Sequence, residues 1–142
     1  MTTIVDKNVA LIRRAYQCLE NRDLDTAQEL LTENFIANAP GVAEPLHGRD
    51  VWRMGSEIML DAFPDLKIDV QDIFGVGDKV TVLVNFRATH LGAFQEFEAT
   101  GRTVTYRSVE VYRFEGDQIA EEWVAPDLLS LMQQIAPTTP DH

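Results

Sequence analysis

The hydrophobic period of this chain changes once, near Pro64 and Asp65, and this change restricts the possible folds more than any other feature. Before it, apolar residues recur every three or four positions, which predicts amphipathic helices over residues 6–21 and 49–63. Between them, Asp25 and Gln28 resemble a capping box that opens a short helix. After the change, apolar and polar residues alternate, which predicts β-strands. The expected strands start at residue 66, with a bulge at 72–73, and continue over 80–90, 94–98, 103–114 and 119–124.

Helices followed by a run of antiparallel strands predict an α+β fold, with the helices packed on one face of a curved sheet. An extended segment at 35–39 and a last helix at 127–134 complete the expected elements. With 142 residues, no internal repeat and no linker, the chain suits one domain over 1–142. Its tail, 137–142, is expected to be flexible.

The charge and the rare residue types exclude several classes of function. A net charge of -11 disfavours nucleic acid and anionic membranes as partners, because both attract basic patches. No apolar run reaches membrane-spanning length, and the first residues lack the order of a signal peptide, so we expect a cytoplasmic protein. The single cysteine, Cys18, reads as a small buried side chain of the first helix. Scattered histidines and the absence of nucleotide-binding motifs predict neither a metal nor a cofactor.

Glu110 lies on the apolar face of the longest expected strand, 103–114. A carboxylate there is either paired with an arginine of a neighbouring strand or has a raised pKa, because burial penalises its charged form. Glu110 is therefore a candidate catalytic acid, with an ion pair as the alternative. The same face of the strand carries Val104, Tyr106, Ser108, Tyr112 and Phe114.

The last expected strand carries two consecutive glutamates, Glu121 and Glu122, directly before Trp123. Successive side chains of a strand point to opposite faces, so only one of the two can face the core. Glu122 shares its face with Ala120 and Val124, which favours Glu122 as the inward acid. A one-residue bulge would exchange the two glutamates.

His90 ends the apolar face of the strand 80–90, where a histidine can act as acid or base at the mouth of a pocket. The alternative is a histidine that only caps the end of the strand. Asn38 could hydrogen-bond a ligand carbonyl or start the turn before Pro40. Three apolar residues of the helix 49–63 are most simply explained as core residues: Trp52, Met59 and Phe63. If the protein has a pocket, the same residues would line it. With Tyr106, Ser108 and Trp123 they complete the candidate substrate-binding set.

The opposite face of the strand 103–114 mixes apolar residues with arginines, at Arg107, Val109 and Val111. This composition suits an interface between copies of the chain, so we expect a homodimer or a higher homo-oligomer. Exposure to solvent is the alternative for this face.

Several segments together resemble the SnoaL-like polyketide cyclase family, which belongs to the NTF2-like α+β barrels. They are residues 62–66, 89–94 with 100–102, and 112–114 followed by Trp123 and Asp127, so that the resemblance covers residues 6–135. It implies a cone-shaped barrel, with a strongly bent sheet around helices and an apolar cavity. It also implies ring closure of an aromatic polyketide by intramolecular aldol condensation, without a cofactor.

The resemblance also implies roles for particular residues. In the family, an acidic residue just before the tryptophan of the last strand serves as acid/base, and Glu122 matches it. A histidine of the preceding long strand corresponds to Ser108 here, and Glu96 and Ala99 stand where the family has glycine and proline. Glu122 would remove a proton next to a carbonyl, while His90 or a neutral Glu110 would donate a hydrogen bond to the enolate oxygen.

Two other functions remain open on the same scaffold. One is a polyketide tailoring enzyme, such as a ring hydroxylase, which the missing strand histidine would suit. The other is a small-molecule-binding protein without catalysis. A shared fold does not decide among these activities.

Overall fold

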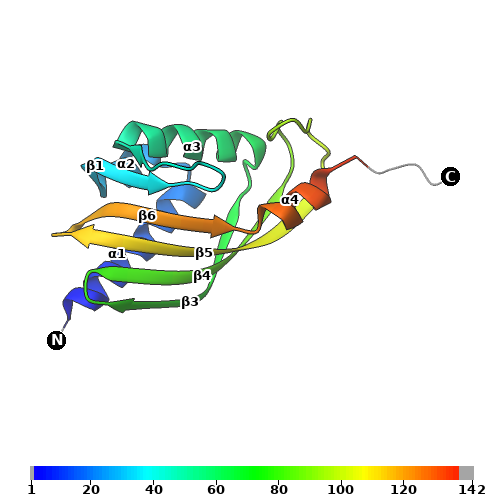
Figure 1. Cartoon of the computed structure of the whole chain (residues 1–142). Coiled ribbons are helices and arrows are strands. Elements are labelled where there is room, and N and C mark those ends of the chain that lie inside the picture. The colour runs from blue at the N-terminus through cyan, green and yellow to red at the C-terminus, as the bar shows by residue number, and fades with distance from the viewer. Residues whose placement is uncertain (1, 138–142) are drawn as a thin grey trace.

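The computed structural model describes residues 2–137, which form four helices and six strands (Figure 1). The prediction of an α+β fold is confirmed. The predicted tail at 137–142 falls, apart from its first residue, outside the described residues. The helices are α1 (Ile4–Glu20), α2 (Leu24–Glu29), α3 (Arg49–Ala62) and α4 (Leu128–Ile135). The strands are β1 (Leu31–Asn38), β2 (Leu46–His47), β3 (Lys67–Val76), β4 (Lys79–Thr89), β5 (Thr103–Glu115) and β6 (Gln118–Pro126).

All six strands form one sheet in the order β2-β1-β6-β5-β4-β3. The pairing is antiparallel except between β1 and β6, which run parallel. The expected bulge in β3 is present, as a shift of register between Val70 and Asp72. The strands β5 and β6 are joined by a two-residue turn, in which Gly116 has a positive φ of 60°.

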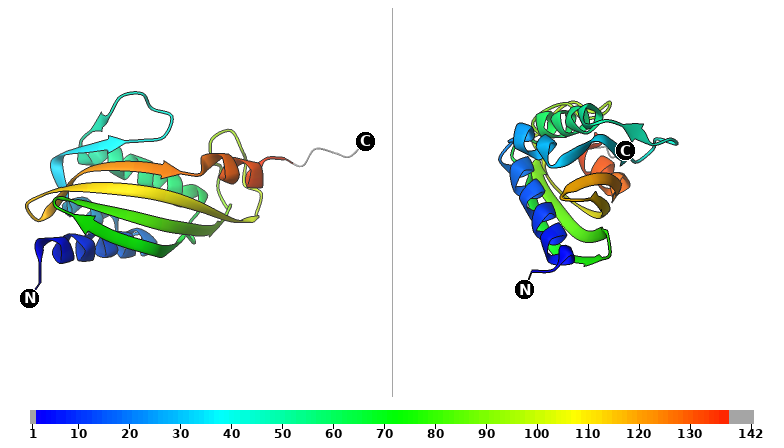
Figure 2. Two further views of the ribbon diagram at one scale, coloured as in Figure 1. Left: turned by 60° about the horizontal axis from the view of Figure 1, so that its bottom comes forward. Right: turned by 90° about the vertical axis from the view of Figure 1, so that its left-hand side faces the viewer.

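The helices α1 and α3 pack against one face of the bent sheet, called the inner face below (Figure 2). The other face is called the outer face. Every second residue of β4 and β5 is buried on the inner face, as the alternation in their sequences predicts. Phe35, Phe63, Leu131 and Ile135 are fully buried in the core, and Cys18 is buried as predicted. Within the described part of the chain, no helix is long and apolar enough to cross a membrane.

Two local predictions are wrong. The expected strand at 94–98 is a loop, because Phe94 and Phe97 exchange their backbone hydrogen bonds with each other, which leaves none for the sheet. The chain just before this loop packs tightly on the end of α3: a Cβ on Gly92 would lie 2.2 Å from the carbonyl oxygen of Asp61, so only glycine fits. The short second helix is capped by Asp23, whose side chain accepts from Thr26 N–H, and not by Asp25.

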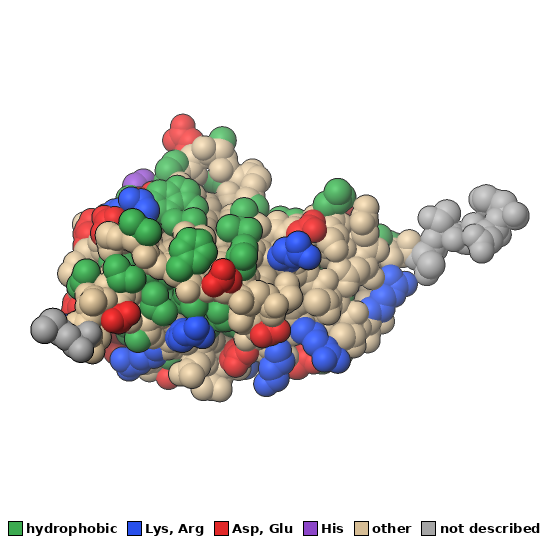
Figure 3. All heavy atoms as spheres, turned by 90° about the horizontal axis from the view of Figure 1, so that it is seen from below, with side chains coloured by type: hydrophobic (Ala, Val, Ile, Leu, Met, Phe, Trp, Pro, Cys, Tyr) green, Lys and Arg blue, Asp and Glu red, His purple; other side chains and the backbone are tan. Residues whose placement is uncertain are grey.

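Hydrophobic side chains gather on part of the surface seen from the side of β3 (Figure 3). They lie mainly over the left half of the view, where acidic and basic side chains also occur, and further acidic and basic side chains continue along the lower edge and to the right. Exposed apolar residues of the outer face include Leu83 and Val109, which are paired across β4 and β5. Dimerisation through the face that carries Val109 stays a prediction.

Candidate active site

The register between β5 and β6 brings two glutamates to the inner face. Tyr112 pairs with Glu122, and Glu110 pairs with Val124. Directly opposed residues of an antiparallel pair lie on the same face, so Glu122 shares the inner face with Glu110 and Tyr112. Glu121 lies on the outer face, where it pairs with Arg113.

Glu110 is buried and accepts hydrogen bonds from three hydroxyl groups. Tyr16 of α1 and Tyr112 donate to its Oε1, at 2.8 and 2.6 Å, and Ser108 donates to its Oε2 at 3.0 Å. Each hydroxyl has a single proton to donate, so this arrangement suits an ionised, acceptor-only carboxylate. The expected alternatives for Glu110, an ion pair with arginine and a neutral proton donor, do not match these contacts.

The surrounding tyrosines remain proton donors over the whole physiological range. Burial, together with the negative charge of Glu110, raises the pKa of Tyr16, Tyr112 and Tyr106 above the usual value for tyrosine. Tyr16 was not among the expected site residues. The sequence does contain an indication of its role, since Tyr16 lies on the apolar face of a helix. A tyrosine hydroxyl that is buried in this way needs a polar partner.

Glu122 differs from Glu110 in its surroundings. It is half-buried, and its carboxyl group forms no hydrogen bond with any residue of the described part of the chain. Burial, and secondarily the charge of Glu110, raises its pKa to about 8. Glu122 is therefore mostly protonated near neutral pH, and it is a much stronger base than an ordinary glutamate once it is ionised.

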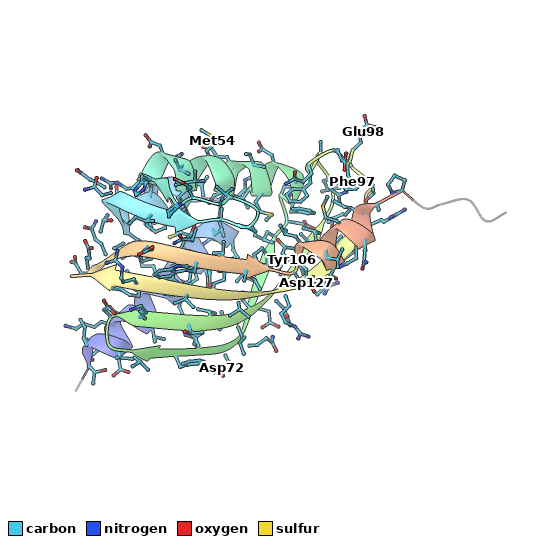
Figure 4. The ribbon with its side chains drawn as sticks, viewed as in Figure 1. Met54, Asp72, Phe97, Glu98, Tyr106 and Asp127 are labelled. Atoms are coloured by element: carbon cyan, nitrogen blue, oxygen red, sulfur yellow. The ribbon has the colours of Figure 1, made fainter. Side chains whose placement is uncertain are left out.

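The residues expected to line the site are buried to different extents. Trp52 and Met59 of α3 are half-buried and pack against the core. Phe63, Tyr106 and Ser108 are buried, so a ligand would reach them only if their neighbours moved. The hydroxyl of Tyr106 lies 3.5 Å from the sulfur of Met59, which joins β5 to α3. By contrast, Met54 projects from α3 away from the sheet (Figure 4).

His90 is too far from Glu110 and Glu122 to share their chemistry. Its backbone N–H donates to the carbonyl oxygen of Arg102, eight positions before Glu110 on the same chain, which is roughly 25 Å along a strand. The ring is fully buried against Phe63, and burial lowers its pKa. Its Nδ1 accepts from the backbone of Thr100. The expected role of His90 as a donor in the same site is therefore not supported.

Asn38 and Trp123 also lie away from the inner face, which corrects their expected place in the site. The side chain of Asn38 donates to Oε2 of Glu121 at 3.0 Å and to the backbone oxygen of Glu122 at 2.9 Å. Trp123 pairs with Val111, on the outer side of β6. Asn38 therefore holds β1 to β6 and orders the outward glutamate.

Two surface depressions lie away from the inner glutamates. One, of about 500 Å³, lies between α2 and α3; the other, of about 250 Å³, lies at the end of the sheet near β3 and β4. The first is lined by Asp25, Gln28, Glu29, Arg49 and Asp50, and the second by Asp65, Lys67, Arg87, Ala88, Thr89 and Thr103. Among residues 2–137, no group of three or more histidine, cysteine or acidic side chains is arranged to hold a metal ion.

A bent sheet with helices packed on its inner face is also the fold of an NTF2-like protein from Burkholderia pseudomallei K96243, which matches with a TM-score of 0.76 at 20% identity and covers 92% of this chain and 98% of that one. The family model for SnoaL-like polyketide cyclases matches residues 9–135, and the chain belongs to that family. No curated protein sequence matches it significantly.

Solved structures resemble the whole chain. A protein from Jannaschia sp. CCS1, provisionally named a SnoaL-like polyketide cyclase, has a TM-score of 0.89 at 22% identity, covering 97% of this chain and 98% of that one. IdmH from Streptomyces antibioticus, provisionally named a polyketide cyclase, has a TM-score of 0.79 at 26% identity, covering 90% and 97%. AclR from Streptomyces galilaeus, provisionally named a hydroxylase, has a TM-score of 0.81 at 25% identity, covering 92% and 83%.

Proposed function

We propose that the protein is a cofactor-independent enzyme that closes a ring in an aromatic polyketide by acid/base catalysis, with Glu122 as the group that transfers the proton. One observation carries the proposal: Glu122 faces inward without a hydrogen-bond partner in the described part of the chain, and its pKa is raised to about 8. Membership of the SnoaL-like family and the name of IdmH support the substrate class.

The proposed step uses Glu122 twice. The ionised carboxylate takes a proton from the carbon next to a carbonyl group of the substrate, which leaves an enolate. The enolate carbon attacks a second carbonyl carbon of the same molecule, so that a carbon–carbon bond forms and the attacked oxygen becomes an alkoxide. The alkoxide takes the proton back from Glu122, so the enzyme returns to its initial state and no co-reactant is consumed. His90 and Glu110 have no part in this step as proton donors.

The experiment is a comparison of wild-type protein with Glu122→Gln, using aromatic β-dicarbonyl compounds that carry a ketone or aldehyde within reach of the nucleophilic carbon. We expect turnover to fall by roughly 10²–10⁴-fold, because that is the usual contribution of a positioned acid or base. Ligand affinity should change little, because the amide keeps the shape of the side chain. Equal losses of affinity and turnover, or full turnover in the variant, would contradict the proposal. A protein that only binds its ligand would show no turnover in either form.

A ring hydroxylase is the second candidate, favoured by the name of AclR and by Ser108 in place of the family's histidine. Mass spectrometry after reaction under labelled oxygen separates the two. Aldol closure leaves the substrate mass unchanged or lower by one water, whereas hydroxylation adds one labelled oxygen atom.

A further inference from the structure

Glu110 is a buried carboxyl group that forms no ion pair within the described part of the chain. Its polar contacts are the hydroxyl groups of Tyr16, Tyr112 and Ser108. The nearest arginines along β5, Arg107 and Arg113, lie on the outer face of the strand, where Arg113 pairs with Glu115 and Glu121. The polar groups that Glu110 contacts are therefore three hydroxyl donors and no cation.

Glu110 and Glu122 are close enough to interact directly. Since Tyr112 pairs with Glu122 and Glu110 with Val124, the two glutamates are diagonal neighbours on one face of an antiparallel pair. Diagonal neighbours are about 7–8 Å apart, within reach of long side chains. Two carboxyl groups in a shared, partly dehydrated space do not ionise independently: the one with donors ionises first, and the other retains its proton.

We propose that Glu110 is a positioning residue whose charge, fixed by three hydroxyl donors, keeps a proton on Glu122 in the resting site. Its role in turnover rests on the function proposed above, whereas the coupling between the two carboxyl groups does not depend on it. By raising the basicity of Glu122, Glu110 matches that group to the transfer and return of a proton near neutral pH. Glu110 itself touches no reacting atom.

In the described part of the chain, the elements packed around Glu110 and Glu122 bring no other charged side chain close to Glu122, so Glu110 is the charged group that acts on it. On α1 the buried polar residues are Tyr16 and the neutral Asn8, while Arg13 and Arg14 are exposed. The strands β4 and β1 contribute apolar inward residues, such as Val82 and Ala37, which are buried. On β5 the remaining polar groups are Tyr106, Ser108 and Tyr112, which stay neutral. On α3, Arg53 is bound to Asp25 and Glu57.

The test is a titration of the Glu122 carboxyl carbon by NMR, on protein labelled at the glutamate side chains and without ligand. The signal of Glu122 is identified by its loss in Glu122→Gln. In the wild-type protein we expect a midpoint near 8. In Glu110→Gln the midpoint should fall by about one unit or more, because the neighbouring negative charge is gone while burial remains. The glutamine can still accept from Tyr16 and Tyr112 through its carbonyl oxygen.

Glu121→Gln is the matched control, since it removes the same charge from the outer face and should leave the midpoint of Glu122 in place. If Glu110→Gln does not fold, the reciprocal measurement applies: the carbon signal of Glu110 should shift as Glu122 titrates, and should lose this shift in Glu122→Gln. An unchanged midpoint in folded Glu110→Gln, or no such shift of Glu110 in the wild-type protein, would overturn the inference. Full turnover in Glu122→Gln would instead overturn the proposed function and leave the coupling intact.

Discussion

Glu121 and Glu122 are consecutive in the chain, yet their environments are opposite. Glu121 accepts from Nε of Arg113 at 3.1 Å and from Asn38 at 3.0 Å, so its charge is balanced on the outer face. Glu122 faces the core side and has no such partner in the described part of the chain. Its pKa is raised to about 8, so it is still mostly protonated at neutral pH. Identical side chains thus serve structure on one face and supply a candidate catalytic group on the other.

A single residue in β6 decides which glutamate faces inward. The pairing of β5 with β6 shifts between Arg113 and Phe114: Phe114 pairs with Ile119, whereas Arg113 pairs with Glu121, which leaves Ala120 as the extra residue. Ile119 and Ala120 are both buried, as expected at a bulge. With an unbroken register, Tyr112 would pair with Glu121, and that glutamate would face the core. The bulge therefore positions the candidate site.

The largest difference between the two glutamates should be in the pH dependence of turnover. If ionised Glu122 is the base, kcat/KM should rise about tenfold per pH unit below a pH of about 8 and level off above it. Measurement of kcat/KM across this range, in buffers of constant ionic strength, checks the slope. Glu121→Gln should give the same curve as the wild-type protein. A rate that is flat across this range, or that declines as pH rises, would assign proton transfer to another group.

The next difference should appear in the free energy of unfolding. Glu122 has a higher pKa in the folded protein than in the unfolded chain, so the folded state binds the proton more tightly. Its contribution to stability is present below the unfolded pKa, near 4.5, and is lost as pH rises to about 8. We expect a loss on the order of 2–4 kcal/mol across this interval. Urea unfolding at several pH values should show that Glu122→Gln removes most of this loss, whereas Glu121→Gln does not.

Much of the fold could be predicted because periodicity records which face of an element is buried. The alternation in β4 and β5 predicts their inner faces, and the break at Asp72 predicts the bulge in β3. The loop at 94–98 has the composition of a strand, but its hydrogen bonds close within the loop, and no local pattern reveals that. The parallel pairing of β1 with β6 joins segments far apart in the chain, which periodicity does not address.

The candidate site was predictable in part. The inward orientation of Glu122 could be predicted from the apolar residues on its face of the strand. The bulge at Ala120 could not be predicted, because no sequence pattern marks it. The partners of Glu110 could not be predicted, because Tyr16 lies 94 positions away and meets it only when α1 packs on the sheet. The sequence correctly places His90 at the end of a strand. It does not show which end of the sheet carries the two glutamates, so His90 was wrongly grouped with them.

The smallest effect should come from Glu121→Gln on stability. The ion pair of Glu121 with Arg113 is only partly buried, with side-chain exposures of 17% and 23%, and Arg113 keeps a second partner in Glu115. A glutamine at this position can still accept from Asn38. Partly exposed pairs contribute little, so the free energy of unfolding should fall by about 1 kcal/mol or less, without the pH dependence that Glu122 gives. Thermal unfolding measured at low and high salt checks this, since screening should shrink the difference between variant and wild-type protein. A loss of several kcal/mol that salt does not reduce would mean that Glu121 has a larger structural role than its contacts indicate, and the contrast between the two glutamates would be correspondingly weaker.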